Sequence, residues 1–284
     1  MFDFLSSPTR RLFPFLPLLL VFFAAFTNAQ NPARAGATSH HDSQPPQAIV
    51  IGFMGGNVAP DDPTRNELII SGRLRESFPT GTYFEIFENR RFEDAHQKIL
   101  QVLGLQRETI AAQPSEAKKQ TPKIILYGHS WGASAVVTVA DELQRDGIPV
   151  TLTIQVDSIQ KKGQHDAVIP ANVALAVNFY QPDGLLHGRQ EIRAADPSQT
   201  QILGNFRVNY KEMPSECSPY PWYERKFIKT HIAIECDPAL WSRIESLIRE
   251  SLATPPVEPD HNDHAAQPAK PTEVTPVSLA AGRP

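Results

Sequence analysis

A serine flanked by two glycines has a setting in this chain that suits covalent chemistry. The pentapeptide is Gly128-His129-Ser130-Trp131-Gly132. A serine hydroxyl is a weak nucleophile at neutral pH, so it needs exposure and a neighbouring base before it can attack a carbonyl. A sharp turn between a strand and a helix supplies that exposure, and glycines suit the strained, closely packed backbone of such a turn. Since average residue usage produces this pattern by chance in about one chain of this length in ten, its weight depends on the flanking elements.

Those flanking elements are a strand and a helix. Residues 123–127 form the short apolar run Lys-Ile-Ile-Leu-Tyr, which is typical of a buried strand. After Trp131 the apolar residues continue to Leu143 and surround the helical axis on almost all sides, as expected for a helix packed inside a fold. The order of strand, serine turn and helix therefore predicts that Ser130 is a nucleophile.

With this arrangement the chain resembles the α/β-hydrolase superfamily over about residues 49–248, and in particular its small, lidless esterases and lipase-like enzymes. The resemblance implies an α/β fold with a mainly parallel central sheet and helices on both faces. It also implies a triad of serine, acid and histidine that hydrolyses an ester-like bond. We expect no cofactor and no metal.

The superfamily order of nucleophile, acid and histidine places the base downstream of Ser130. His231 is the leading candidate, because it follows the last predicted strand and precedes the predicted terminal helix. His187 and His165 are the competing candidates. His129 adjoins the nucleophile in sequence and should point elsewhere, so we expect it to fill structure.

Three aspartates compete for the role of the acid. Asp157 stands at the carboxyl end of the apolar run 151–156, where a carboxylate can orient the histidine and stabilise its charged form. Most of the superfamily uses the next strand, where Asp183 fits, and Asp166 is a third possibility. We favour Asp157, because Pro-Asp-Gly around Asp183 is also an ordinary turn sequence.

Acyl transfer also needs donors for the developing oxyanion. Trp131 supplies the backbone N–H after the nucleophile. The run Gly52-Phe53-Met54-Gly55-Gly56 resembles the superfamily's His-Gly-x-x-Gly loop, with Ile51 in place of the histidine, and that match makes Phe53 the second donor. The alternatives are a glycine-rich turn without a role and a phosphate-binding loop, but the Gly-Lys-Ser/Thr ending of the latter is missing.

Strands and helices alternate along the remaining chain. Thr64 to Glu67 has capping-box spacing before a helical apolar face, and Asp237-Pro238 is a helix-opening pair. This alternation predicts a mainly parallel sheet with helices on both sides. The predicted strands are 48–51, 83–87, 123–127, 150–156, 173–180 and 206–210, and the predicted helices follow residues 64, 92, 131 and 238.

The two ends differ in composition from the middle. Residues 1–29 combine two arginines, an apolar run shorter than the roughly 20 residues of a membrane span, and a small-residue exit at Ala29. We predict a signal peptide there, a disordered linker at 30–46, a hydrolase domain at 47–252 and a disordered Pro-rich tail at 253–284. The mature protein should be secreted or periplasmic, without a stable membrane anchor.

The two cysteines, Cys217 and Cys236, would meet an oxidising compartment after export, so a disulfide between them is plausible; two free thiols are the alternative. Closing a loop of that size contributes about 3 kcal/mol to stability in the chain-entropy model.

Charge and composition narrow the substrate class. The net charge is -4 and no basic stripe is present, which argues against nucleic acid as a partner. The aromatic run Tyr220 to Tyr223 could form an apolar wall above Ser130, and the lack of a long insertion between strands predicts an open site. We therefore predict a monomeric, secreted serine hydrolase that cleaves a small carboxylic ester or thioester. An acyltransferase and a catalytically inactive binding module are the alternatives.

Overall fold

The computed structural model describes residues 46–105, 122–210 and 212–253. The predicted signal peptide, nearly all of the predicted linker and all but the first residue of the predicted tail lie outside these ranges, so the domain boundaries stay predictions. Within the described part of the chain, no helix combines the length and apolar character that crossing a bilayer requires.

A six-stranded sheet forms the centre of the domain, and every pairing within it is parallel. Its strand order is β2-β1-β3-β4-β6-β8. A separate pair of two-residue strands, β5 and β7, lies outside it. The bounds are β1 (Ala48–Met54), β2 (Thr82–Glu88), β3 (Lys123–His129), β4 (Val150–Val156), β5 (Val168–Ile169), β6 (Val173–Tyr180), β7 (Arg193–Ala194) and β8 (Gln201–Arg207).

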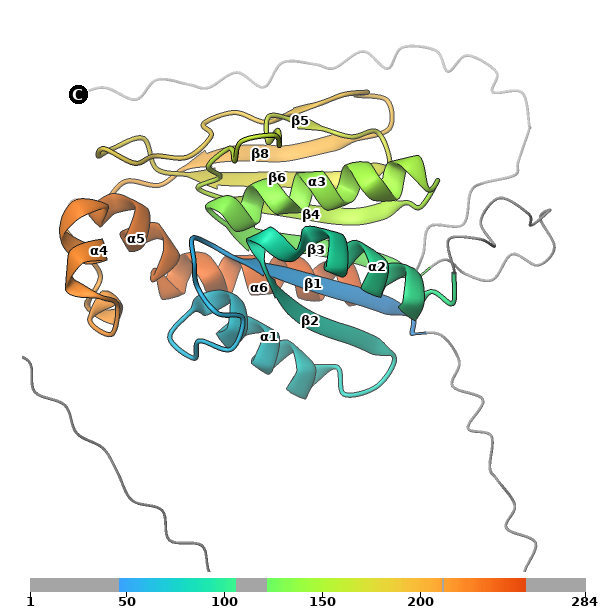
Figure 1. Ribbon diagram of the computed structural model, residues 1–284, viewed down its shortest axis with the longest axis horizontal. Helices are drawn as coiled ribbons and strands as arrows, with labels where there is room; N and C mark the ends of the chain where they lie inside the picture. The colour runs from blue at the N-terminus through green and yellow to red at the C-terminus, as the bar shows by residue number, and fades with distance from the viewer. Residues whose placement is uncertain (1–45, 106–121, 211, 254–284) are drawn as a thin grey trace, which may run out of the picture. The chain divides into compact units, whose positions relative to one another are not determined.

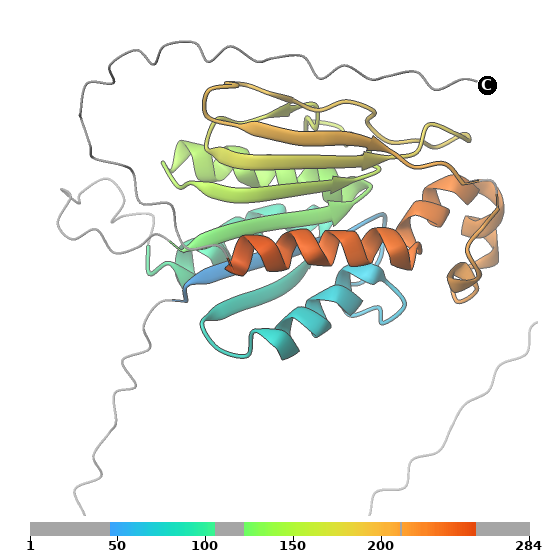
Figure 2. The same cartoon turned by 180° about the vertical axis from the view of Figure 1, so that it is seen from behind.

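Helices cover both faces of this sheet. Figure 1 shows α2 and α3 over one face, and Figure 2 shows α6 and α1 over the other. Because both faces are covered, the central strands are continuous apolar runs, and every residue of β1 is buried. The predicted fold class is therefore confirmed. The helix bounds are α1 (Asn66–Ser77), α2 (Phe92–Val102), α3 (Trp131–Arg145), α4 (Trp222–Phe227), α5 (Lys229–Glu235) and α6 (Pro238–Ala253), with 3-10 turns η1 (Asn89–Arg91) and η2 (Ser215–Cys217).

The start of α1 differs from the sequence prediction. Arg65 precedes the helix in an extended conformation and offers no side-chain cap, while the hydroxyl of Thr64 donates to Asp62 at 2.7 Å. The side chain of Glu67, which should close the capping box, is instead completely buried. The capping-box prediction is therefore wrong, because Glu67 packs into the interior near the serine turn.

The last strand is also displaced from its prediction. We expected it at 206–210, but β8 covers Gln201–Arg207. The register with β6 shifts between Ala176 and Val177, opposite Gly204, whose φ is +156°. This irregular edge strand is only half buried, and it lacks the continuous apolar run that marks the central strands.

Parallel strands bring their carboxyl ends to the same edge of the sheet. The residues that follow β1, β3 and β4 are Gly55, Ser130 and Asp157, and α4 and α5 lie at this same edge in Figure 1. Ligand sites of open parallel sheets form at such edges, so this one is where the candidate site is built.

Candidate functional site

Ser130 occupies a strained backbone turn between β3 and α3. Its φ of 56° and ψ of -122° lie outside the regions that residues with a side chain normally adopt. The neighbouring glycines are needed for close approach: a Cβ on Gly128 would lie 2.6 Å from the carbonyl carbon of Gly132, and one on Gly132 would overlap the carbonyl of Phe53. The sequence therefore folds into the sharp turn that the pentapeptide predicted.

His231 lies on α5 and reaches both Ser130 and Asp157. Its Nε2 is 2.9 Å from the Ser130 Oγ, and its Nδ1 is 2.6 Å from the Asp157 Oδ2. A proton on Nδ1 allows that nitrogen to donate to the carboxylate and leaves Nε2 free to accept the serine hydroxyl. This arrangement can remove a proton from Ser130 and stabilise the resulting imidazolium.

Asp157 follows β4 and is fully buried. Besides His231, its carboxylate accepts the backbone N–H of Gly188 at 2.8 Å and the side-chain amide of Gln181 at 2.9 Å. A Cβ on Gly188 would lie only 2.6 Å from the Asp157 Oδ1, so this contact requires glycine. Sequence analysis missed Gln181 and Gly188, because only the fold brings them to the end of β4.

The competing residues do not share this arrangement. The side chain of Asp183 is exposed, although its backbone carbonyl accepts the Thr230 hydroxyl at 2.6 Å. Asp166 is buried and accepts the hydroxyl of Ser158 and the guanidinium of Arg189. His187 and His165 are both exposed, and His165 pairs with Asp141. The structure thus unites Ser130, Asp157 and His231, and leaves Asp183, His187 and His165 outside the group.

A cleft of about 630 Å³ opens above Ser130. Of the predicted aromatic wall, Pro221 and Tyr223 line this cleft, whereas Trp222 stays 64% exposed and Tyr220 is buried beneath the Arg65 guanidinium at 4.4 Å. The opposite wall is the loop after β1. The remaining lining residues include Gly55, Gly56, Asn57, Val58, Ala59, Asp62, Glu224, Ile228, Ile159 and Leu186.

The loop after β1 begins beyond Phe53, the predicted oxyanion donor. Phe53 is still inside β1, where it pairs in register with Gly128, and its side chain is completely buried. The cleft lining begins two residues later, at Gly55. A Cβ on Gly55 would lie 3.2 Å from the Ser130 Cβ, so this glycine is pressed against the serine turn. Trp131 is the first residue of α3, where a helix leaves its N–H without an intrahelical acceptor.

A disulfide joins Cys217 to Cys236, as predicted. It closes the segment that contains α4, α5 and therefore His231. Both sulfur-bearing side chains are buried together with Tyr220 and Ile232, so the bridge and this small apolar cluster hold the histidine-bearing segment in shape.

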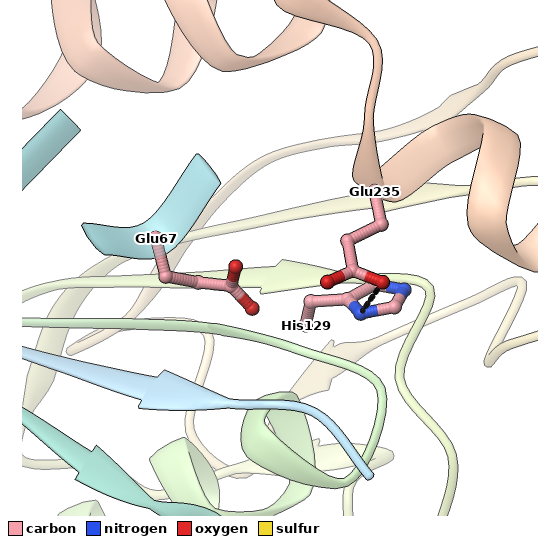
Figure 3. Close-up of side chains that lie close together, drawn as sticks. All are labelled: Glu67, His129 and Glu235. Carbon is pink, nitrogen blue, oxygen red and sulfur yellow. Dashed lines mark ion pairs between the residues drawn. The ribbon is translucent and has the colours of Figure 1, made fainter. Parts of the chain in front are cut away.

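Figure 3 shows a group of buried ionisable side chains formed by Glu67, His129 and Glu235. The imidazole of His129 packs against that of His231, with ring centroids 4.5 Å apart, and its Nδ1 is 3.5 Å from the Glu235 Oε2. Arg65 donates to the other oxygen of Glu235 at 2.8 Å. Glu67, His129 and Glu235 each offer an atom within 4.8 Å of the others, which is a donor set that could hold a cation. Sequence analysis assigned His129 to structure and missed the glutamates.

Burial controls the protonation of this group. It lowers the pKa of His129 well below the ordinary 6.5, helped by the nearby His231 and Arg65. Burial also raises the pKa of Glu67 to about 8, helped by the neighbouring charge of Glu235. For Glu235, burial raises the pKa as well, but the Arg65 guanidinium opposes that shift. His129 is therefore neutral, and Glu67 is the carboxyl group that most readily keeps a proton.

No protein-family model and no curated protein matches the sequence. Among solved structures, the chain aligns with a protein from Xanthomonas campestris pv. campestris described as a hydrolase of the alpha/beta superfamily, at 15% identity and a TM-score of 0.35, covering 72% of this chain and 99% of the other. An acetylxylan esterase aligns at 11% identity and a TM-score of 0.37, covering 74% of this chain and 100% of the other. A thioesterase of the prodiginine biosynthetic pathway in Streptomyces coelicolor aligns at 9% identity and a TM-score of 0.38, covering 72% of this chain and 91% of the other.

Values of this size say nothing about the activity or substrate of this chain. The fold class stands on the strand order, the parallel pairings and the helical layers of this chain, which form a parallel α/β sheet with helices on both faces.

Proposed function

We propose that this protein is a serine hydrolase that cleaves a carboxylic ester or thioester through an acyl-enzyme on Ser130. The observation that carries the proposal is the chain of contacts from the Ser130 hydroxyl through His231 to Asp157, with distances of 2.9 and 2.6 Å. Each group has the chemistry that its place in this chain demands: a nucleophile, a base and a buried carboxylate.

The first half of the reaction forms the acyl-enzyme. The Ser130 Oγ attacks the carbonyl carbon while the Nε2 of His231 takes its proton, and a tetrahedral oxyanion results. When the carbonyl re-forms, the bond to the leaving alcohol or thiol breaks and His231 returns the proton to that group. In the second half, water attacks the acyl carbon in the same way and releases the acid. Asp157 stays ionised and orients the imidazole throughout.

The oxyanion needs two N–H donors on one side of Ser130. We assign one to Trp131, at the start of α3. For the second we favour the loop of Gly55 and Gly56 over Phe53, because Phe53 is buried within β1 whereas the two glycines line the cleft. This assignment replaces the residue that the loop resemblance suggested, while it keeps the donor on the same loop.

The cleft is the proposed binding site for a small ester or acyl substrate. Apolar side chains from both walls, including Val58 and Ile228, can contact an acyl or alcohol group. Arg65 is the only lysine or arginine among the described lining residues, so the cleft lacks the basic surface that nucleic-acid binding needs. The disulfide supports export to an oxidising compartment, so we propose a secreted or periplasmic enzyme that acts as a monomer and needs no cofactor.

The test is covalent labelling followed by turnover. A fluorophosphonate probe should label the wild-type protein and Ser246→Ala, a control on the exposed surface of α6, but not Ser130→Ala. Ester hydrolysis should then be measured on a series of p-nitrophenyl esters of increasing acyl length. Persistent labelling of Ser130→Ala would place the nucleophile elsewhere. An intact wild-type fold that is never labelled would favour the inactive binding module, and ester products formed with added alcohols would favour the acyltransferase.

A further inference from the structure

The mechanism above leaves three buried ionisable side chains without a task. They come from different elements and converge behind the site: Glu67 from the first turn of α1, His129 from the end of β3 and Glu235 from the end of α5 (Figure 3). All three are buried, and one atom of each lies within 4.8 Å of the others. His129 contacts the ring of His231, so this group adjoins the proposed general base directly.

The charges within the group do not balance. Arg65 donates to the Oε1 of Glu235 at 2.8 Å, but it also pairs with Asp62 and Glu224. Among the described residues no side chain donates a hydrogen bond to the carboxyl oxygens of Glu67. Burial and the charge of Glu235 raise its pKa, and they outweigh the backbone N–H groups of Glu67 and Gly55 and the charge of Arg65, which lower it. A buried carboxylate without a side-chain donor is expensive to ionise. The group therefore calls for one more positive charge, which either a proton or a metal ion could supply.

The geometry favours the proton. Ligand atoms around a tetrahedral zinc ion lie about 3.4 Å apart, as follows from bond lengths near 2.1 Å. His129 and Glu235 meet this spacing at 3.5 Å, whereas the three ligand atoms together lie only within 4.8 Å of one another. A divalent ion would also share Glu235 with the guanidinium of Arg65, which already contacts it. A proton on Glu67 adds no such repulsion.

We propose that Glu67 holds a proton in the resting protein, and that Glu67 and Glu235 act as positioning residues that keep a neutral His129 packed against His231. This inference rests on the proposed function for its catalytic consequence. His231 must become an imidazolium during each half-reaction. A neutral ring beside it tolerates that charge. Loss of the proton from Glu67 would favour a proton on His129, and a charged His129 would repel the imidazolium of His231.

The surroundings of Glu67 define the pH range. The facing groups are Glu235 from α5, His129 and Tyr127 from β3, Arg65 before α1, and Tyr220 from the disulfide-closed segment. Burial and Glu235 raise the pKa of Glu67 to about 8, whereas an unfolded glutamate titrates at 4.5. Between pH 4.5 and about pH 8 the folded protein therefore binds one proton more than the unfolded chain. Its stability falls as the pH rises from about 5 to about 8 and then levels off, because above that range both the folded and the unfolded state have lost the proton.

The decisive variant is Glu67→Gln, which has the shape and neutrality of the protonated acid. Glu76→Gln is the matched control, since Glu76 lies on the exposed side of the same helix. Wild type and Glu76→Gln should lose kcat/KM above about pH 8 through kcat, with KM nearly constant, whereas Glu67→Gln should retain its rate over that range. The melting temperature of Glu67→Gln should exceed that of wild type by more at pH 8 than at pH 5. Identical pH profiles for wild type and Glu67→Gln would overturn the proposal.

Two measurements on wild-type protein keep the test independent of that variant's folding and of catalysis. Infrared difference spectra between pH 7 and pH 9 should show loss of a protonated carboxyl band, and absence of any such band would overturn the proposal. Metal analysis of the wild-type protein should find no stoichiometric metal, and one zinc per chain would overturn the proposal in favour of a metal ion. If the infrared and melting results hold but a fluorophosphonate never labels the protein, the proposed function fails while the proton assignment stands.

Discussion

The Nε2 of His231 lies 2.9 Å from the Oγ of Ser130, although 101 positions separate the two residues in the chain. One approaches from the turn after β3 and the other from α5, a short helix within the disulfide-closed segment. The contact between these two residues depends on the tertiary fold. Substitutions of the residues that form or support this contact should therefore each have a distinct effect.

Removing either member of this pair should cost the same activity. Residues that act as a unit in one proton transfer show nearly equal losses, on the order of 10⁶-fold in kcat, and the losses do not add. We therefore expect Ser130→Ala, His231→Ala and the double variant to hydrolyse p-nitrophenyl acetate at the same residual rate. A double variant much slower than either single variant would show that the two residues act independently.

The two candidate acids should separate clearly. Asp157 contacts His231 at 2.6 Å, whereas the side chain of Asp183 is exposed. Asp157→Asn should lower kcat by about 10⁴-fold, because the amide favours the wrong histidine tautomer. Asp183→Asn should change it by less than about threefold, and it serves as the matched control. A large loss at Asp183 with little loss at Asp157 would contradict the assignment.

The disulfide should matter for both stability and rate. Replacing Cys217 and Cys236 together by alanine should lower the free energy of unfolding by about 3 kcal/mol in denaturant titrations. Because the bridge closes the segment that carries His231, the folded variant should also lose kcat more than KM. If the variant unfolds at the wild-type denaturant concentration, the bridge contributes nothing that the surrounding packing does not already supply.

Sequence patterns predicted those parts of the site that depend on local structure. The serine turn was visible because a buried strand, two glycines and an apolar helix are consecutive, and His231 and Asp157 were predicted from the order of triad residues that the resemblance implies. The capping-box prediction failed because the fate of Glu67 depends on Glu235 and His129, which only the fold brings near it. We propose a loop donor after Phe53, at the following glycines, because β1 extends to Met54, beyond the predicted end of that strand.

Substitution of Gly188 should lower kcat strongly, although this residue has no side chain. Its N–H donates to the Asp157 Oδ1 at 2.8 Å. A Cβ there would meet the Asp157 backbone and carboxylate, so Gly188→Ala must move Asp157 away from His231. We expect a loss of about 10²-fold in kcat, in line with a displacement of 1 Å, and wild-type rates for Gly72→Ala, a helical glycine of α1 with open space around it.

The charges that line the cleft should select against anionic substrates. Asp62, Glu224 and Glu235 face the cleft with Arg65 as the cation among them, and Arg65 contacts all three carboxylates. One guanidinium cannot neutralise three carboxylates, so the mouth of the site keeps a negative potential that repels like charge. A p-nitrophenyl ester with a free carboxylate on its acyl chain should have a kcat/KM about tenfold below that of its neutral methyl ester at low salt.

The difference in kcat/KM between the charged and the neutral ester should narrow as the salt concentration rises, because the Debye length falls to about 3 Å at 1 M. Glu224→Gln should narrow it at low salt without slowing the neutral ester, since Glu224 lies on α4 and does not contact the serine, histidine or aspartate of the site. Equal rates for the charged and neutral esters at low salt would mean that the acyl group binds away from these carboxylates.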